Sequence, residues 1–154
     1  MKRISIGLFL TFIGLIIFSA CQENAYVDWK IANDQWYEKH KSDEGFVATS
    51  TGILYKVYSP GWDYSRQPNS GSDVRVSYTG SLVDGTTFDS STDTWIGLSS
   101  AIAGWKEIIP KMRTGARFKM YIPSKMAYDT VTTNTSIPPH SVLIFDVTLL
   151  GSSN

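Results

Sequence analysis

The chain has 154 residues, of which 42% are hydrophobic and 18% are charged, and its formal net charge is zero. This composition is typical of a globular protein with one ordinary domain and some additional segments, and it excludes a disordered or low-complexity chain. Basic and acidic residues are equal in number and form no basic patch in the sequence, so nucleic acid is not expected as a partner.

The first twenty residues are predicted to be a targeting segment and not part of the fold. Lys2 and Arg3 precede an apolar run, Ile4 to Phe18, that is too short to span a bilayer comfortably. Small residues then precede Cys21, the only cysteine, so residues 1–20 resemble a bacterial lipoprotein signal whose cysteine is lipidated. The alternative is an ordinary signal peptide or an uncleaved anchor. Both interpretations export the remaining chain, and we expect it in the bacterial cell envelope, anchored to a membrane by lipid.

Residues 21–51 are predicted to form a tether, a helix and a polar linker. The helix extends from Tyr26 to His40, and its untidy apolar face consists of Trp29, Ala32 and Trp36, with Tyr26 and Ile31 as weaker members. This helix would either pack on the following domain or serve as a contact with a partner or a second copy. His40 has no second His or Cys at ligand spacing, so no metal site is expected.

The sequence after the linker shows the alternating pattern of half-buried strands. Strands are predicted at Gly52 to Ser59, from Val74 with a return through Phe88, at Thr94 to Leu98, at Gly115 to Ile122 and at Ser141 to Leu150. Asp84-Gly85 predicts a tight hairpin. The last of these strands has apolar residues on both faces, which is typical of a central strand.

One short helix is predicted within this domain, from Ala101 to Ile109. Trp105, Ile108 and Ile109 would share one of its faces, and Pro110 would end or kink it. Four or five strands with one internal helix and one preceding helix indicate the α+β class, with an antiparallel sheet wrapped around the short helix.

Three ordered segments carry a resemblance to a known family. They are V-S-Y-T-G-S-L-V-D-G-T-T-F-D-S-S, A-I-A-G-W-K-E-I-I-P-K-M-R-T-G, and A-Y followed by I-P-P-H-S-V-L-I-F-D-V-T-L-L. In this order they resemble an FKBP-type peptidyl-prolyl cis-trans isomerase, with the domain at residues 52–151. The preceding T-G-I-L-Y-K-V is similar to bacterial envelope members, which place a helical part before the domain. The resemblance implies a bent antiparallel sheet around a short helix, with an aromatic pocket between them.

The resemblance also implies which residues form the site. The substrate-binding residues would be Tyr78, Phe88, Ala101, Trp105, Ile137 and Phe145. The catalytic residues would be Asp89, Tyr128 and Ile102: the Ile102 N–H and the Tyr128 hydroxyl would bind carbonyls, and Asp89, bonded to Tyr78, would lie near the twisting carbonyl. Taken singly, Phe145 and Ile102 are better explained as ordinary core residues. The joint occurrence of the matches at the right places in the chain favours a pocket.

The chain departs from the family pattern at several positions. The segment from Ser91 to Trp105 is shorter than in the best-known small members. Thr94 replaces a basic residue, which would remove an ion pair to Asp89. Trp95 is the one aromatic that would replace a loop aromatic of the family, and Asp129 stands where glycine usually follows the loop tyrosine.

The leading hypothesis is a lipid-anchored prolyl isomerase without a cofactor that acts on proline-containing polypeptides of the envelope. Binding of the family's macrolide inhibitors is expected to be weak or lost. The second hypothesis is a binding or chaperone module that keeps the pocket but has little isomerase activity. The third is a structural envelope protein that dimerises or docks through the helix at residues 26–40.

Overall fold

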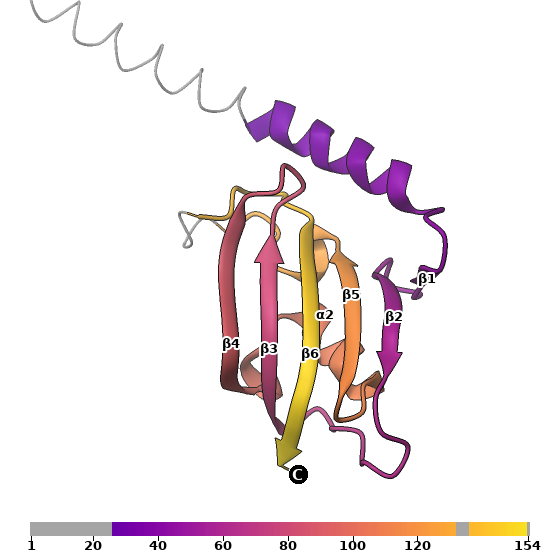
Figure 1. The fold of residues 1–154 in the computed structure, drawn as a ribbon. Coiled ribbons are helices and arrows are strands. Elements are labelled where there is room, and N and C mark those ends of the chain that lie inside the picture. Colours follow the sequence, from indigo (N-terminus) through magenta and orange to yellow (C-terminus); the bar gives the residue numbers. More distant parts are fainter. Residues whose placement is uncertain (1–25, 132–135, 154) are drawn as a thin grey trace, which may run out of the picture.

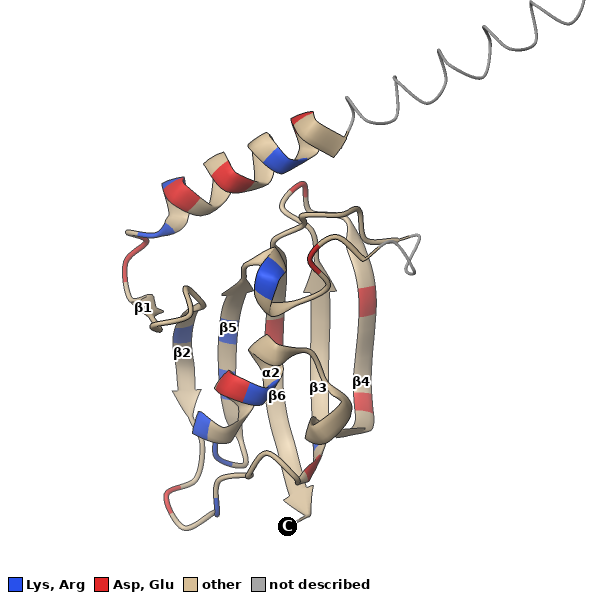
Figure 2. Ribbon diagram, turned by 180° about the vertical axis from the view of Figure 1, so that it is seen from behind, with Lys and Arg blue, Asp and Glu red and all other residues tan. Residues whose placement is uncertain are grey.

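The computed structural model describes residues 26–131 and 136–153 (Figure 1). In this part of the chain, six strands form one antiparallel sheet in the order β1-β2-β5-β6-β3-β4. The strands are β1 (Val47–Ala48), β2 (Leu54–Pro60), β3 (Asp73–Ser81), β4 (Thr87–Gly97), β5 (Ala116–Ile122) and β6 (Leu143–Ser153). The short helix α2 (Ala103–Ile108) lies against one face of the sheet, and the helix at residues 26–40 lies across one end of it (Figures 1 and 2). The predicted α+β architecture is therefore confirmed.

The strand β6 occupies the centre of the sheet, as its two apolar faces predicted. It pairs with β5 on one side and with β3 on the other. The strand β4 is longer than predicted, because the return from the hairpin and the short strand at 94–98 form one continuous edge strand. The predicted linker at 42–51 contains the two-residue strand β1, which pairs with β2.

The helix α2 is shorter than predicted because two 3₁₀ turns flank it. These turns are Leu98–Ser100 on one side and Ile109–Lys111 on the other. Ile102 has extended backbone angles (φ −61°, ψ 154°), so regular helix begins at Ala103. Pro110 has no amide hydrogen to donate, which agrees with the change from α-helix to 3₁₀ geometry at this point.

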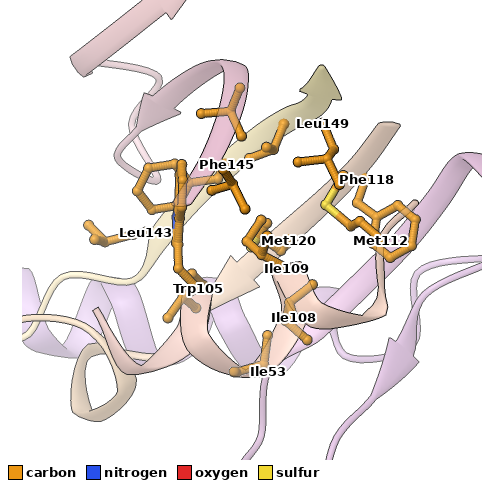
Figure 3. Close-up of a cluster of buried hydrophobic side chains, with 14 of the residues drawn as sticks. Ile53, Trp105, Ile108, Ile109, Met112, Phe118, Met120, Leu143, Phe145 and Leu149 are labelled. Atoms are coloured by element: carbon orange, nitrogen blue, oxygen red, sulfur yellow. The ribbon is translucent and has the colours of Figure 1, made fainter. Parts of the chain in front are cut away.

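The hydrophobic core lies between the sheet and the segment around α2 (Figure 3). The helical side contributes Trp105, Ile108, Ile109 and Met112, and the sheet contributes Phe118, Met120, Leu143, Phe145 and Leu149. Full burial of one large apolar side chain stabilises a fold by about 1.5–3 kcal/mol. This shared core therefore holds α2 firmly against the sheet and fixes the position of Trp105.

The helix at residues 26–40 packs on the domain through a face that overlaps the predicted one only in part. Ala32 is exposed and Ile31 is about half exposed, whereas the polar Asn33 is fully buried. The inward face carries the predicted Trp29 and Trp36 together with Asn33, Tyr37 and His40, at helical spacing. The apolar pattern included the exposed Ala32 and omitted Asn33, because it gives no weight to a polar side chain with buried hydrogen-bond partners.

Contacts along the whole length of this helix dock it on the domain. The Trp29 indole N–H donates to Ser141 Oγ at 2.9 Å. Further along, the Trp36 ring meets Tyr121 of β5 edge-on, with 4.9 Å between centroids, and Tyr37 donates its hydroxyl hydrogen to the Gly52 carbonyl. These contacts support the first of the two roles considered for this helix, packing on its own domain.

The predicted leader at residues 1–20 and the predicted lipid attachment at Cys21 lie outside the described residues. Between 26 and 131 and between 136 and 153, no helix has the length and apolar character needed to cross a membrane. The same ranges hold no cluster of three or more His, Cys, Asp or Glu side chains suited to a metal ion. Charges of both signs are interspersed along the helix at 26–40 and over the sheet (Figure 2).

Candidate active site

A pocket opens between α2, the β3–β4 hairpin and the segment around Tyr128. Its lining consists of Tyr78, Phe88, Asp89, Ile96, Ala101, Ile102, Trp105, Tyr128 and Phe145. The structure thus brings together every residue expected at the site except Ile137. The cavity volume is about 120 Å³, below the roughly 300–1,000 Å³ of sites for drug-sized ligands. It suits one small apolar group.

The floor of the pocket is made of aromatic rings that meet edge-to-face. Trp105 and Phe145 are only 4% and 5% exposed. Their ring centroids lie 5.3 Å apart at 81° (Figure 3), and Tyr78 meets Trp105 at 5.4 Å and 88°. Such near-perpendicular pairs are favoured by the ring quadrupoles, beyond the burial of apolar area. The Trp105 N–H is buried without a hydrogen-bond partner in the described part of the chain, so packing alone holds this ring.

One glycine of β3 leaves room for the rings of Phe88 and Phe145, which together form the aromatic wall of the pocket. A Cβ atom built on Gly80 would lie 2.6 Å from the Phe88 ring and 2.8 Å from the Phe145 ring. Both distances are below van der Waals contact, so any side chain at this position would displace the rings. The two rings themselves meet at 5.5 Å and 87°. Sequence reasoning missed Gly80 because a glycine within a strand usually signals only a bulge or a close backbone approach.

A tyrosine and a carboxylate form the polar side of the pocket. The Tyr78 hydroxyl donates to Asp89 Oδ2 at 2.6 Å. Burial, and then the hydrogen bond to Asp89, raise the pKa of Tyr78 well above its usual value, so this phenol stays protonated and remains a donor. No Lys or Arg in the described residues forms an ion pair with Asp89, which agrees with the replacement of the family's basic residue by Thr94.

The entry to α2 presents a free backbone donor beside the aromatic floor. The Ile102 carbonyl accepts from the amides of Trp105 and Lys106, at 3.0 and 3.2 Å. The Ile102 N–H itself has no partner within residues 26–131 and 136–153, as is normal at the start of a helix. Since Ile102 lines the pocket, a bound carbonyl is a chemically suitable partner for this amide.

Tyr128 lies at the rim of the pocket with 39% of its surface exposed. It follows the 3₁₀ turn Ser124–Met126. The amide of the next residue, Asp129, donates a hydrogen bond to the Ser124 carbonyl at 2.9 Å. Asp129 has φ 48°, in the left-handed region that favours glycine. The aspartate at a position where the family usually has glycine therefore keeps a glycine-like backbone.

Two residues considered for the pocket wall do not line the cavity. Ile137 is buried in the core and does not line the cavity. Trp95 is 56% exposed and is also absent from the lining, so it does not replace the missing loop aromatic. The next residue, Ile96, lines the pocket instead. The β3–β4 pairing shifts register between Val76 and Tyr78, and such bulges reorient the side chains of a strand in a way that alternation does not reveal.

Known proteins are similar to this chain in both sequence and fold. A family model described as FKBP-type peptidyl-prolyl cis-trans isomerase matches residues 64–150. FKBP-type peptidyl-prolyl cis-trans isomerase FkpA of Aeromonas hydrophila is 38% identical over 122 residues, which are 77% of this chain and 44% of that protein. Outer membrane protein MIP of Legionella longbeachae is 31% identical over 126 residues, which are 79% of this chain and 53% of that protein.

A solved structure extends the similarity beyond the matched domain. The crystal structure of FkpA from Escherichia coli covers 99% of this chain and 74% of its own, with a TM-score of 0.85 and 29% identity. The chain spans about half the length of the curated relatives it matches. Because the family model covers more than half of the sequence, the chain belongs to the family of FKBP-type peptidyl-prolyl cis-trans isomerases.

Proposed function

We propose that this protein is a peptidyl-prolyl cis-trans isomerase that binds proline in the pocket between α2 and the sheet. The observation that carries the proposal is the small aromatic pocket with a free amide, two tyrosine hydroxyls and one carboxylate at its edge. Membership of the isomerase family supports the same activity. The domain responsible is residues 52–151, and its substrates are proline-containing polypeptides.

The chemistry needs a dry pocket more than it needs reactive groups. Rotation about an X–Pro bond crosses a barrier of ~18–20 kcal/mol because the amide loses its resonance. The planar ground state separates charge more than the twisted transition state does. An apolar enclosure therefore favours the twisted form relative to water, and this preference lowers the barrier. Trp105, Phe88 and Phe145 provide such an enclosure for a proline ring.

The few polar groups orient the peptide. The Ile102 N–H binds a carbonyl next to the proline, and the Tyr128 hydroxyl binds another. Asp89, held by the Tyr78 hydroxyl, lies near the carbonyl that twists. No proton is transferred in the reaction, so Asp89 acts through its charge and position and not as a general acid or base.

We also propose that the protein works in the bacterial cell envelope, attached to a membrane by a lipid on Cys21 after removal of residues 1–20. The name of the similar Legionella longbeachae protein, an outer membrane protein, supports an envelope location. The small cavity supports weak or absent binding of macrolide inhibitors.

A prolyl-peptide isomerisation assay on the full chain in detergent tests the proposal. We expect the protein to accelerate isomerisation, and we expect Asp89→Ala and Tyr128→Phe each to lower kcat/KM by roughly 10–100-fold, as one lost hydrogen bond to a charged or twisting group allows. Matched controls are Asp93→Ala, on the same strand and outside the pocket lining, and Tyr64→Phe, which is 85% exposed. Full activity in both site variants would refute the site assignment.

The second candidate is a binding or chaperone module with little isomerase activity. The absence of an ion pair to Asp89 among the described residues favours it, because the carboxylate is then held by one hydrogen bond only. A folded protein that binds a proline peptide but does not accelerate its isomerisation would select this candidate.

A further inference from the structure

A fully buried asparagine connects the helix at residues 26–40 to the start of β6. Asn33 Oδ1 accepts a hydrogen bond from the Val142 amide at 2.8 Å, and Asn33 Nδ2 donates to the Trp29 carbonyl at 2.9 Å. Val142 is buried as well. Without Asn33 its amide would be left unpaired away from water, which is unfavourable for any backbone donor.

A second hydrogen bond from the same helix reaches the neighbouring residue. The Trp29 indole N–H donates to Ser141 Oγ at 2.9 Å, and Ser141 Oγ donates in turn to the Pro138 carbonyl at 2.6 Å. Trp29 and Asn33 are one helical turn apart, so they point in the same direction. Together they fix the main chain at positions 138–142.

The segment held in this way is bonded to the residue that follows Tyr128. The His140 amide donates to the Asp129 carbonyl at 2.7 Å. Both residues have positive φ, 48° for Asp129 and 64° for His140, which is strained for residues other than glycine. Strained backbone of this kind persists only where the surroundings hold it in place, and the helix supplies such a restraint on the His140 side.

We propose that the helix at residues 26–40 positions Tyr128 in the pocket. Trp29 and Asn33 hold residues 138–142, the His140–Asp129 hydrogen bond transmits this restraint, and Tyr128 is thereby kept at the rim of the site. Trp29 and Asn33 are positioning residues, since neither lines the pocket. The consequence for catalysis rests on the proposed isomerase function, whereas the mechanical connection does not.

The other contacts of the helix allow positioning to be separated from docking. Tyr37 donates to Gly52 and Trp36 packs on Tyr121, and both contacts lie nearer the other end of the helix. The variant Tyr37→Phe therefore loses one docking hydrogen bond but leaves the Trp29–Ser141 and Asn33–Val142 hydrogen bonds in place. The variant Gln35→Ala changes an exposed position of the same helix. These two variants are the matched controls for Asn33→Ala.

The first measurement is amide hydrogen exchange at residue resolution on the full chain in detergent. We expect Asn33→Ala to speed exchange of the His140 amide at least tenfold relative to the Gly115 amide, which bonds to Leu149 in a distant part of the sheet. We expect neither control to do so. Unchanged His140 exchange in a folded Asn33→Ala protein would overturn the proposal. If Asn33→Ala does not fold, the variant Trp29→Phe takes its place: it keeps one aromatic ring, removes the indole donor and part of the ring volume, and must speed His140 exchange.

The second measurement is a double-mutant cycle in the isomerisation assay. We expect Asn33→Ala to lower kcat/KM about 3–10-fold, and Tyr128→Phe to have a smaller effect in the Asn33→Ala background than in the wild type. Fully additive effects would refute the link to Tyr128. If the wild type shows no isomerase activity, the proposed function fails, and the exchange measurement still decides whether the helix positions this segment.

Discussion

The substitution Gly80→Ala tests whether the aromatic wall of the pocket depends on the bare backbone of β3. The added methyl group would lie 2.6 Å from the Phe88 ring and 2.8 Å from the Phe145 ring. Phe145 is nearly buried and contacts Trp105, so it has little room to move. Phe88 is only half-buried, and its ring is the group we expect to shift.

Overpacking of this kind typically costs about 1–3 kcal/mol of unfolding free energy. For a domain of this size the corresponding fall in Tm is several degrees. The same displacement changes the wall of the cavity, so a proline peptide should bind more weakly even where the protein is fully folded. Both effects come from one methyl group and should appear together.

Gly151→Ala is a matched control, because Gly151 also lies in the sheet but a Cβ atom there would meet nothing within 4 Å. Thermal unfolding followed by circular dichroism and the isomerisation assay should be run on both variants. We expect Gly151→Ala to keep its Tm and activity within error. If Gly80→Ala behaves in the same way, the close approach of the two rings to β3 does not constrain the site, and the argument is refuted.

Three further predictions concern stability. Trp105→Ala should lower the unfolding free energy by about 3–5 kcal/mol in urea titrations, because it removes a large buried ring from the core; a loss below 1 kcal/mol would contradict its role in the floor. Gly104→Ala should cost about 1–3 kcal/mol in the same titrations, since its Cβ would lie 2.6 Å from the buried Ile122 side chain, and wild-type stability would contradict this packing. The raised pKa of Tyr78 makes the folded state hold this proton more tightly than the unfolded chain, whose tyrosines titrate near ~10. The stabilisation that Tyr78 provides is therefore complete below pH ~10 and is lost as the pH rises beyond that value. In urea titrations above pH ~10, the unfolding free energy should fall less steeply with pH in Tyr78→Phe than in wild type. Equal dependence of the unfolding free energy on pH in the two proteins would refute the assignment.

Much of the fold follows from residue patterns, but the edges of the sheet do not. Alternation located β3, β5 and β6, where one face or both faces meet the core. The strand β4 was recognised only in pieces because it is an edge strand with many exposed polar residues. A strand without a buried face has no two-residue hydrophobic period to detect. The extent of β4 is therefore defined by its pairing with β3 and not by its own sequence.

The ordered motifs predict most of the residues that line the pocket, and the differences have specific physical causes. Ile137 stands at the right place in the chain, but it turns into the core. Ile96 was overlooked because a bulge in the β3–β4 pairing, and not the local sequence, decides which of two neighbouring residues faces the cavity. Asn33 was overlooked because apolar periodicity gives no sign of a buried amide whose partner lies more than a hundred residues away.

The central place of β6 has a consequence for how the protein is made. In the sheet, β6 lies between β5 and β3 and pairs with both. Until residues 143–153 are synthesised, nothing therefore joins β5 to β3. Without residues 143–153, a nascent chain can form neither the complete core nor the part of the pocket that contains Phe145. Folding must therefore follow synthesis of the whole domain, and the long-range strand pairings predict slow folding for its length. During this interval the edges of β3 and β5 that β6 will cover stay unpaired, which leaves the nascent chain open to aggregation.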